Sequence, residues 1–387
     1  MQSNIWKLQV IQVLYKTMFF LPVLVLFLMD NGLSLAEIMI LQSVFSFMIV
    51  FLEIPSGYFA DVFSRRLSII LCSIFGVVGL VGYIVADSFY MFLIAETFFA
   101  LASALNSGAD SALMYDTLVE LKQQKRFKKV WGDTAFYALV TVASASILGG
   151  FIAGISLRWT FYAALPFAIL SIPVAFTLVE PKRHKLVMEK GYTAKLFEIF
   201  KDIHTNIKLR WLILYGAVIY TFTQVAFWLY QPYFVLSGLD ILYFGFVFAG
   251  FNYFAAFCSK YMHRIESFLG MRKSLVLIPV LLLSGYMLMG NIVVWFSFIF
   301  AFFHQFADAF NRVVLADYIH SLTTSDVRAT VMSAKGMLSK LLYAVCLPVI
   351  GVVADVYSVT QAMTIIGIIG FGVSVVLLGV LHYEKVW

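Results

Sequence analysis

The sequence predicts an all-α membrane protein with twelve transmembrane helices in two related six-helix halves, on the evidence of its composition, its apolar runs and an internal repeat. Hydrophobic residues make up 62% of the 387-residue chain and charged residues 12%. Soluble proteins are about 45–50% apolar and about 25% charged. The mean hydropathy is +0.93. A water-soluble fold cannot cover so much apolar surface, so the excess must face lipid.

Apolar runs long enough to cross a bilayer, which takes about 20 residues, recur along the whole chain. We expect spans at 6–29, 36–60, 67–86, 89–115, 131–155, 159–179, 211–236, 241–262, 274–293, 295–317, 330–353 and 360–381. The connections between these spans are too short to hold a soluble enzyme domain.

The basic residues lie almost entirely on one side of these spans. Apart from Arg158, the Lys and Arg residues outside the span interiors cluster around Arg65–Arg66, Lys122–Lys129, Lys182–Arg210 and Arg264–Lys273. Short loops rich in Lys and Arg stay in the cytoplasm. We therefore expect a multi-pass protein of the cytoplasmic (inner) membrane with both termini in the cytoplasm. The net charge of +6 belongs to these loops and predicts no nucleic-acid partner.

A long connection separates the first six spans from the last six. We expect an N-terminal six-helix bundle at 1–180, a cytoplasmic linker at 181–210 and a C-terminal six-helix bundle at 211–387. Apolar residues at helical spacing within the linker predict an amphipathic helix on the inner membrane surface. They are Leu196, Ile199, Phe200, Ile203 and Ile207.

The two halves resemble each other weakly at a constant offset of 201 residues. The segment from Asp110 to Asp116 matches the segment from Asn311 to Asp317, and Gly150 matches Gly351. A repeat with an even number of helices keeps its orientation in the membrane. We therefore expect two parallel six-helix repeats with a solute path between them.

The stretch from Gly57 to Arg66, between the second and third spans, resembles the signature of the major facilitator superfamily, Gly-x-x-x-Asp-x-x-Gly-Arg-Arg/Lys. Ser64 stands where the signature has its second Gly, and a degenerate copy, Gly270–Lys273, lies between the eighth and ninth spans. The resemblance implies a major-facilitator-type fold for the whole chain. We call the following residues the cytoplasmic gate motif: Gly57, Asp61, Arg65, Arg66 and Asp116.

The resemblance also implies how this motif works. Asp61 faces the N-terminus of the eleventh span near Ala329, where the helix dipole favours an anion. Arg65 pairs with Asp116 at the inner end of the fourth span. Together these contacts hold the outward-open state and release on the return. The alternative is a positive-inside loop with an unrelated carboxylate.

The drug:proton antiporters are the branch of the family that the sequence weakly resembles, with two departures. Their Gly-Pro pair late in the fifth span is replaced by glycines without proline at 147–154. Glu96 occupies the place of their Arg in the fourth span. The proton route typical of that branch therefore does not transfer directly to this chain.

Ionisable residues inside a span cost about 2.5–3.5 kcal/mol each on insertion scales, so they usually face the bundle interior. Lys16 in the first span and Glu96 in the fourth approach mid-depth from opposite sides, at about 1.5 Å per residue. In the family's architecture these spans line the central cavity, so we expect Lys16 and Glu96 to face each other. They form either a substrate or proton site or a structural ion pair.

The tenth span carries His304, Asp308 and Arg312 at four-residue spacing, on one helix face. The eleventh span adds Lys340 near the depth of Asp308, and Lys335, which either joins this group or extends toward the inner surface. A His or a carboxylate beside cations has a pH-sensitive occupancy, so Asp308 or His304 is suited to carry a coupling proton. The predicted substrate or proton pathway comprises Lys16, Glu96, His304, Asp308, Arg312 and Lys340.

The seventh span offers polar and aromatic side chains that either bind a solute or pack within the bundle. They are Tyr220, Thr221, Thr223, Gln224, Trp228 and Tyr230. The sequence holds no motif for ATP binding, for zinc-dependent hydrolysis or for a nucleophilic serine, so we expect neither an enzyme nor a cofactor or metal site.

We therefore predict a monomeric secondary active transporter in the lipid bilayer, which moves a small organic solute by alternating access. Coupling to protons is expected, and export is slightly favoured. The first alternative is proton-coupled uptake of an anionic or zwitterionic metabolite, which the excess of cations in the pathway would suit. The others are a lipid-moving protein and a non-transporting membrane sensor on the same fold.

Overall fold

The computed structural model describes residues 1–182, 206–324 and 327–386, and within these ranges every regular element is a helix. The α-helices are α1 (Ser3–Lys16), α2 (Leu24–Asp30), α3 (Leu35–Val62), α4 (Arg65–Val85), α5 (Phe89–Asn106), α6 (Ala109–Glu120), α7 (Phe127–Ala153), α8 (Trp159–Phe176), α10 (Ile207–Leu236), α11 (Ile241–Asn291), α12 (Ala301–Ser321), α13 (Arg328–Val356) and α14 (Val359–Tyr383). The short 3-10 helices are η1 (Leu21–Val23), η2 (Gln124–Arg126) and η3 (Ser297–Phe300).

These helices account for all twelve predicted spans. In the described part of the chain, 10 helical segments are long and apolar enough to cross a membrane. One of them, α11, has 51 residues, more than twice the length that a bilayer requires, and Gly270 with φ 73° turns the chain between its two spans. The remaining span is α12, which carries Asp308, Arg312 and Asp317 among its 21 residues. The predicted all-α fold with twelve spans is confirmed.

Two spans are interrupted along their length. In the first span, α1 ends at Lys16, residues 17–20 are not helical, and η1 leads into α2. In the fourth span, Ser107 and Gly108 separate α5 from α6, and Gly108 has φ 77°. A positive φ is readily adopted by glycine and costs other residues about 1–2 kcal/mol. The sequence predicts both spans as continuous helices, so the structure adds these two breaks.

The chain folds into two compact units. Unit 1 comprises Met1–Leu33, Val44–Glu189 and Ile241–Ala249, and unit 2 comprises Ser34–Ser43, Lys190–Asp240 and Gly250–Trp387. The predicted division of the bundles at the 181–210 linker stays a prediction. Residues 183–205, which carry most of the predicted amphipathic pattern, lie outside the described residues.

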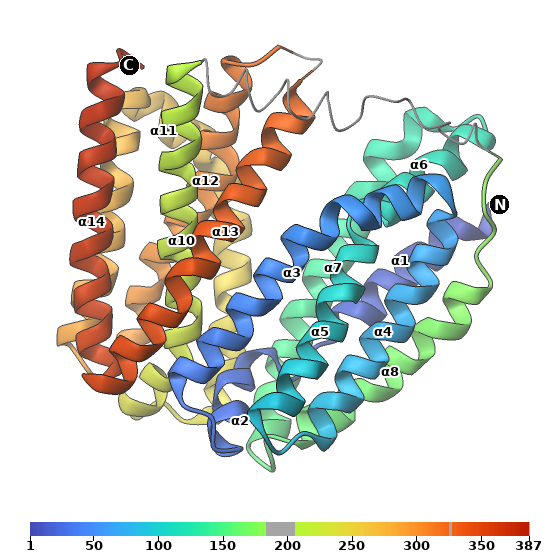
Figure 1. The fold of residues 1–387 in the computed structure, drawn as a ribbon, viewed down its shortest axis with the longest axis horizontal. Coiled ribbons are helices and arrows are strands. Elements are labelled where there is room, and N and C mark those ends of the chain that lie inside the picture. Colours follow the sequence, from blue (N-terminus) through green and yellow to red (C-terminus); the bar gives the residue numbers. More distant parts are fainter. Residues whose placement is uncertain (183–205, 325–326, 387) are drawn as a thin grey trace. The chain divides into compact units, whose positions relative to one another are not determined.

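In unit 1, α4 packs against both α5 and α8, and α1 packs against α7 and α8 (Figure 1). The contact between α4 and α5 depends on small residues. A Cβ atom added to Gly82 would lie 2.7 Å from the Cβ of Ala95, so Gly82 allows the two helices to approach closely. This packing places the polar side chains of the first and fourth spans inside the unit.

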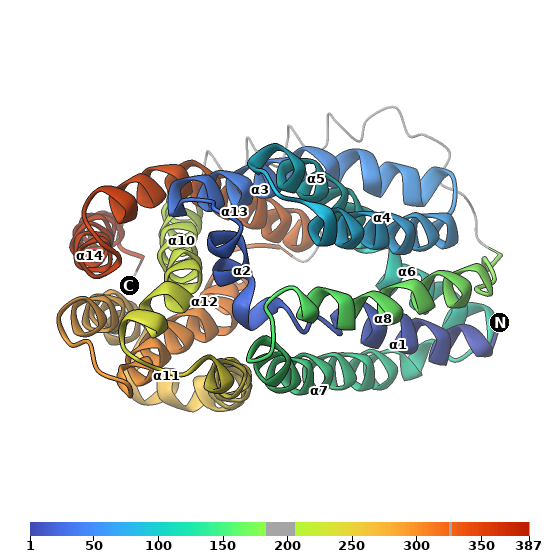
Figure 2. The same cartoon turned by 90° about the horizontal axis from the view of Figure 1, so that it is seen from below.

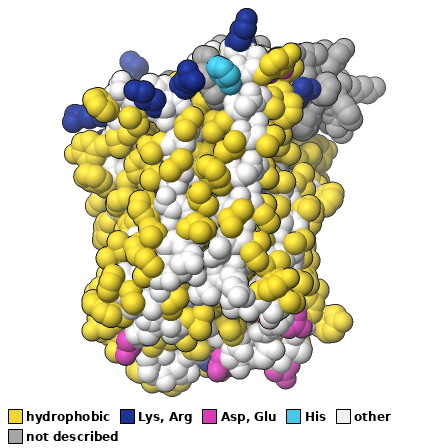
Figure 3. Space-filling model, turned by 90° about the vertical axis from the view of Figure 1, so that its left-hand side faces the viewer, with side chains coloured by type: hydrophobic (Ala, Val, Ile, Leu, Met, Phe, Trp, Pro, Cys, Tyr) yellow, Lys and Arg dark blue, Asp and Glu magenta, His cyan; other side chains and the backbone are white. Residues whose placement is uncertain are grey.

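In unit 2, α10 is the central helix and packs against α12, α13 and α14 (Figure 2). Its buried side chains, among them Leu212, Tyr215 and Ile219, form the core of the unit. The outer face to which α14 belongs is largely apolar (Figure 3). Lys and Arg gather at the end of this face where the chain ends, and Asp and Glu at the opposite end. An apolar band between basic and acidic ends is typical of a membrane-embedded surface.

Candidate functional site

The cytoplasmic gate motif is built around Arg65 at the start of α4. Its guanidinium donates a hydrogen bond to Asp61 in α3 at 3.1 Å and forms a second ion pair with Asp116 in α6. Arg65 also donates to the backbone carbonyl of Ala112 at 3.1 Å. One arginine therefore joins the ends of three helices of unit 1, and the structure contains the Arg65–Asp116 pair expected from the sequence. The contact of Asp61 near Ala329 stays a prediction.

A carboxylate that the sequence analysis did not single out completes this motif. Glu180 accepts hydrogen bonds from the hydroxyl of Ser64 at 2.8 Å and from the backbone N–H groups of Arg65 and Arg66 at 3.1 and 2.8 Å. Ser64 in turn accepts from the N–H of Leu67 at 3.0 Å. Ser64 thus caps α4 with a hydroxyl that glycine lacks, which explains why Ser is accommodated here. Glu180 lies 116 residues away in sequence, so no local pattern indicates it.

The breaks in the first and fourth spans bring together a polar group that we call the Asp110 cluster: Gln12, Lys16 and Asp110. Gln12 donates to one oxygen of Asp110 at 2.6 Å, and the N–H of Ser111 donates to the other at 2.6 Å. Lys16, the last residue of α1, has an electrostatic interaction with Asp110. The cation lies at a helix C-terminus and the anion in a first helical turn, the favourable arrangement for both helix dipoles.

The structure gives Lys16 and Glu96 partners other than the predicted ones. Glu96 is buried, with 5% of its surface exposed, and accepts a hydrogen bond from the hydroxyl of Tyr83 at 2.7 Å. That contact joins α4 to α5. The carboxylate that interacts with Lys16 is instead Asp110. Position along a helix does not give the direction in which a side chain leaves the helix, and that direction decides these partners.

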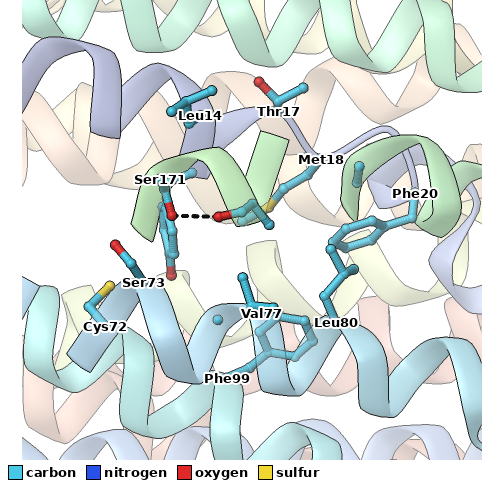
Figure 4. A pocket seen from close by; sticks show the side chains of 14 residues that line it. Leu14, Thr17, Met18, Phe20, Cys72, Ser73, Val77, Leu80, Phe99 and Ser171 are labelled. Carbon is cyan, nitrogen blue, oxygen red and sulfur yellow. Dashed lines mark hydrogen bonds between the residues drawn. The ribbon is translucent and has the colours of Figure 1, made fainter. Parts of the chain in front are cut away.

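A small pocket of about 40 Å³ lies beside the break in the first span (Figure 4). Thr17, Met18 and Phe20 contribute from the interrupted segment, and Ser73 and Val77 from α4. The volume is enough for a few water molecules, which need about 10–15 Å³ of accessible space each. Non-helical backbone within a membrane is tolerated where it is buried in protein or lines a wet cavity, and this pocket meets that condition.

In unit 2, the four-residue spacing on α12 brings Asp308 and Arg312 into an ion pair of 2.8 Å. Gln224 of α10 also donates to Asp308, at 3.4 Å. We call these three residues the Asp308 cluster. The side chain of Asp308 is 13% exposed and that of Arg312 is 59% exposed. The carboxylate is therefore enclosed, while its cation reaches an accessible surface.

Lys335 is buried within unit 2 and does not extend to the inner surface. Only 8% of its surface is exposed, and its ammonium donates to the backbone and side-chain oxygens of Asn311 at 3.3 and 3.1 Å. Asn311 donates to the carbonyl of Gly216 at 3.1 Å. A Cβ at Gly216 would lie 3.1 Å from Cε of Lys335, so the missing side chain makes room for the lysine. Lys335 also interacts electrostatically with Asp308.

His304 lies in a different environment from Asp308, although both are on α12. It is 1% exposed, and its Nδ1 is 3.0 Å from the hydroxyl of Tyr230. Its ring centroid is 4.3 Å from that of Tyr286, and its Nε2 lies against Gly285. This aromatic setting favours a packing role for His304. Lys340 is partly buried on α13.

A family model described as Major Facilitator Superfamily matches residues 10–341. This chain belongs to the major facilitator superfamily. Membership makes it a transporter rather than an enzyme, and the breaks, the gate motif and the buried charge clusters are thus features of a transporter of this superfamily.

Solved structures with the same fold include three transporters. A point mutant of the nucleoside transporter NupG has a TM-score of 0.82 at 13% identity, covering 98% of this chain and 99% of that chain. An inward-facing bacterial homolog of the human lysosomal transporter Spinster has a TM-score of 0.72 at 15% identity, covering 98% of this chain and 95% of that chain. A D-xylose–proton symporter has a TM-score of 0.68 at 13% identity, covering 96% and 95%. A comparison with curated proteins found no match. At such identities the likeness concerns the fold alone.

Proposed function

We propose that this superfamily member is a proton-coupled secondary transporter that moves a small organic solute across the cytoplasmic membrane by alternating access, with export slightly favoured over uptake. The observation that carries the proposal is the presence of ionisable side chains inside apolar spans of both units: Lys16 and Asp110 in unit 1, and Asp308 and Lys335 in unit 2. Such residues are costly in a membrane and mark substrate or proton pathways.

Asp308 is our candidate for the coupling proton. It is enclosed, and its partners are side chains that can rearrange: Arg312, Gln224 and, electrostatically, Lys335. Protonation would remove the charge that holds Arg312 and leave the guanidinium available to another anion or to water. His304 was the other candidate, but its contacts with Tyr230 and Tyr286 favour a structural role.

Uptake of an anionic or zwitterionic metabolite is the second candidate function. It is favoured by the cations of the two clusters and of the neighbouring Lys335, since these three cations outnumber Asp110 and Asp308. Lys335 also has only neutral oxygens as hydrogen-bond acceptors within the described residues. The charge separation on the outer face of unit 2 supports a cytoplasmic C-terminus, and the basic loops of the sequence support the same side for the N-terminus (Figure 3).

The test is reconstitution of the purified protein into liposomes that contain a pH-sensitive dye. Nucleosides, D-xylose and dipeptides are added one at a time across an imposed pH gradient. We expect at least one solute to drive proton movement, and Asp308→Asn to reduce this coupled flux at least tenfold while solute exchange at equal pH persists. Asp87→Asn, at an exposed position between α4 and α5, is the matched control. Full proton coupling in Asp308→Asn would remove Asp308 from the proton route.

The same vesicles give the direction of transport, because an orientation-specific protease can identify which way the protein is inserted. Net solute movement out of the cytoplasmic side against its gradient is expected for an exporter. Accumulation toward the cytoplasmic side supports the second candidate.

A further inference from the structure

α10 presents three large side chains at four-residue spacing on one of its sides: Tyr220, Gln224 and Trp228. All three are partly exposed, whereas Thr221 and Thr223 between them are buried. Thr221 donates to the carbonyl of Ala217 at 2.9 Å, within the helix itself. The structure thus separates the polar side chains of the seventh span into a packed set and an accessible set.

The aromatic members of the accessible set are held by α13. The indole N–H of Trp228 donates to the hydroxyl of Tyr343, which is buried. The ring of Tyr343 meets the ring of Tyr220 edge to face, with centroids 6.1 Å apart and planes at 73°. Tyr343 therefore fixes both neighbours in orientation, so that the rings are positioned before any ligand arrives.

Gln224, the amide side chain of the accessible set, lies beside the Asp308–Arg312 ion pair of α12. Gln224 donates to Asp308 at 3.4 Å, and Asp308 pairs with Arg312. Within the described residues the side-chain carbonyl of Gln224 accepts no hydrogen bond, and the guanidinium of Arg312, which has five donors, is 59% exposed. This edge of the surface therefore offers both a free acceptor and free donors next to the aromatic rings.

We propose that this surface of unit 2 binds the transported solute, and that the solute carries a flat aromatic or heteroaromatic ring with hydrogen-bonding groups on its edge. The ring stacks against Tyr220 or Trp228, and its edge is read by Gln224 and Arg312. The inference rests on the proposed transport function and adds the chemical class of its substrate. Aromatic side chains bind flat rings through their faces, and neighbouring amide and guanidinium groups select among them.

A purely structural role explains less of this arrangement. Tyr230 and Tyr233 of the same helix are fully covered by the protein, both with 0% of their surface exposed. Tyr220 and Trp228 are instead partly exposed, and Tyr220 interacts electrostatically with Arg312, whose side chain is 59% exposed. The combination of fixed rings and unoccupied hydrogen-bonding atoms on one face is typical of a binding surface.

The test is equilibrium binding to the purified full chain by calorimetry, with paired probes that differ in the ring. Adenosine, uridine and tryptophan are compared with D-ribose, D-xylose and leucine. We expect measurable binding for at least one ring compound and at least tenfold weaker binding of its ring-free partner. Trp228→Leu and Tyr220→Leu should each lower the affinity for the ring compound at least tenfold. Trp228→Phe, which keeps a ring, should lower it less than threefold.

Trp295→Leu is the matched control, since this exposed tryptophan of unit 2 lies outside the surface and should leave affinity unchanged. Size-exclusion profiles and thermal unfolding identify a leucine variant that fails to fold. The double variant Trp228→Phe with Gln224→Leu then replaces it. This double variant should lower the affinity for the ring compound at least tenfold. Binding only of ring-free solutes, no binding of any ring compound, or full affinity in both leucine variants overturns the proposal. Proton-coupled transport of a ring-free solute that Asp308→Asn abolishes and Trp228→Leu does not would overturn it while leaving the proposed function intact.

Discussion

The two units use one repeat position in different ways. Asp110 in unit 1 and Asn311 in unit 2 correspond at the repeat offset, and each lies beside a lysine. Asp110 carries a carboxyl group and interacts with Lys16 from the first span. Asn311 is neutral and accepts hydrogen bonds from Lys335 of the eleventh span. Both units therefore have a lysine next to this position. They differ in the residue at the position, which is an acid in unit 1 and an amide in unit 2, and in the span that supplies the lysine.

The residues just before this position account for much of the difference. Gly108 in unit 1 has a positive φ that ends one helix and starts another, so Asp110 lies in a first helical turn with a backbone N–H on its carboxylate. Its repeat counterpart, Ala309, lies inside the uninterrupted helix α12. In unit 2 the carboxylate is instead Asp308, the counterpart of Ser107, and its partners are side chains.

This comparison separates the roles of the two carboxylates. Asp110 accepts a hydrogen bond from the backbone N–H of Ser111 and lies in a first helical turn, in addition to its side-chain partners Gln12 and Lys16. The hydrogen-bonding and ion-pair partners described for Asp308 are the side chains of Arg312 and Gln224. Asp308, which has no backbone donor among its described partners, is the carboxylate that we propose carries the coupling proton.

The largest effect on stability is expected for Asp110→Asn, which gives unit 1 the residue of unit 2. Lys16 would lose its anionic partner, so the free energy of unfolding should fall by about 1–3 kcal/mol. Adding Lys16→Gln should recover a large part of the loss, because the pair is then absent altogether. Unfolding in detergent, titrated with SDS, measures both variants. An Asp110→Asn protein as stable as the wild type would show that Lys16 does not depend on Asp110.

A smaller effect is expected for Gly108→Ala, which tests the break in the fourth span. Alanine at φ 77° costs about 1–2 kcal/mol, so the free energy of unfolding should fall by that amount. Gly132→Ala is the control, since Gly132 lies in α7 with open space around it and alanine should stabilise the helix by about 0.5–1 kcal/mol. The same sign of change at both glycines would contradict the role assigned to Gly108.

The smallest effect is expected for Ala309→Gly, the reverse exchange in unit 2. Glycine inside a helix costs about 0.5–1 kcal/mol, and α12 should stay helical because its packing against α10 is unchanged. Hydrogen exchange of the α12 amides should speed up only modestly. A loss of protection from hydrogen exchange across the whole of α12 would mean that this glycine alone can break the span. Gly108 would then be sufficient for the break in unit 1 without contributions from the surrounding residues.

The sequence determined the number of spans and the family, because each transmembrane helix needs about 20 apolar residues and satisfies its own backbone. The gate motif was also visible, because Gly57–Arg66 resembles the family signature, and Asp61 and Arg65 are four residues apart in it. These features depend on local spacing. The partners of Lys16, Glu96 and Lys335 were not visible, because each is set by the direction in which a side chain leaves its helix and by what the next helix presents there.

Only the tertiary structure decided where the first span breaks. Pro22 gives a local reason, since it lacks an N–H and disfavours helix before it. Yet Pro55, Pro232 and Pro348 lie inside helices that continue, so proline alone does not decide. Gly149 of α7 leaves space for the carbonyl of Phe19, so the non-helical backbone is enclosed by protein. In a membrane a helix can open only where another part of the fold shields its polar groups, and that shielding comes from a residue far away in the sequence.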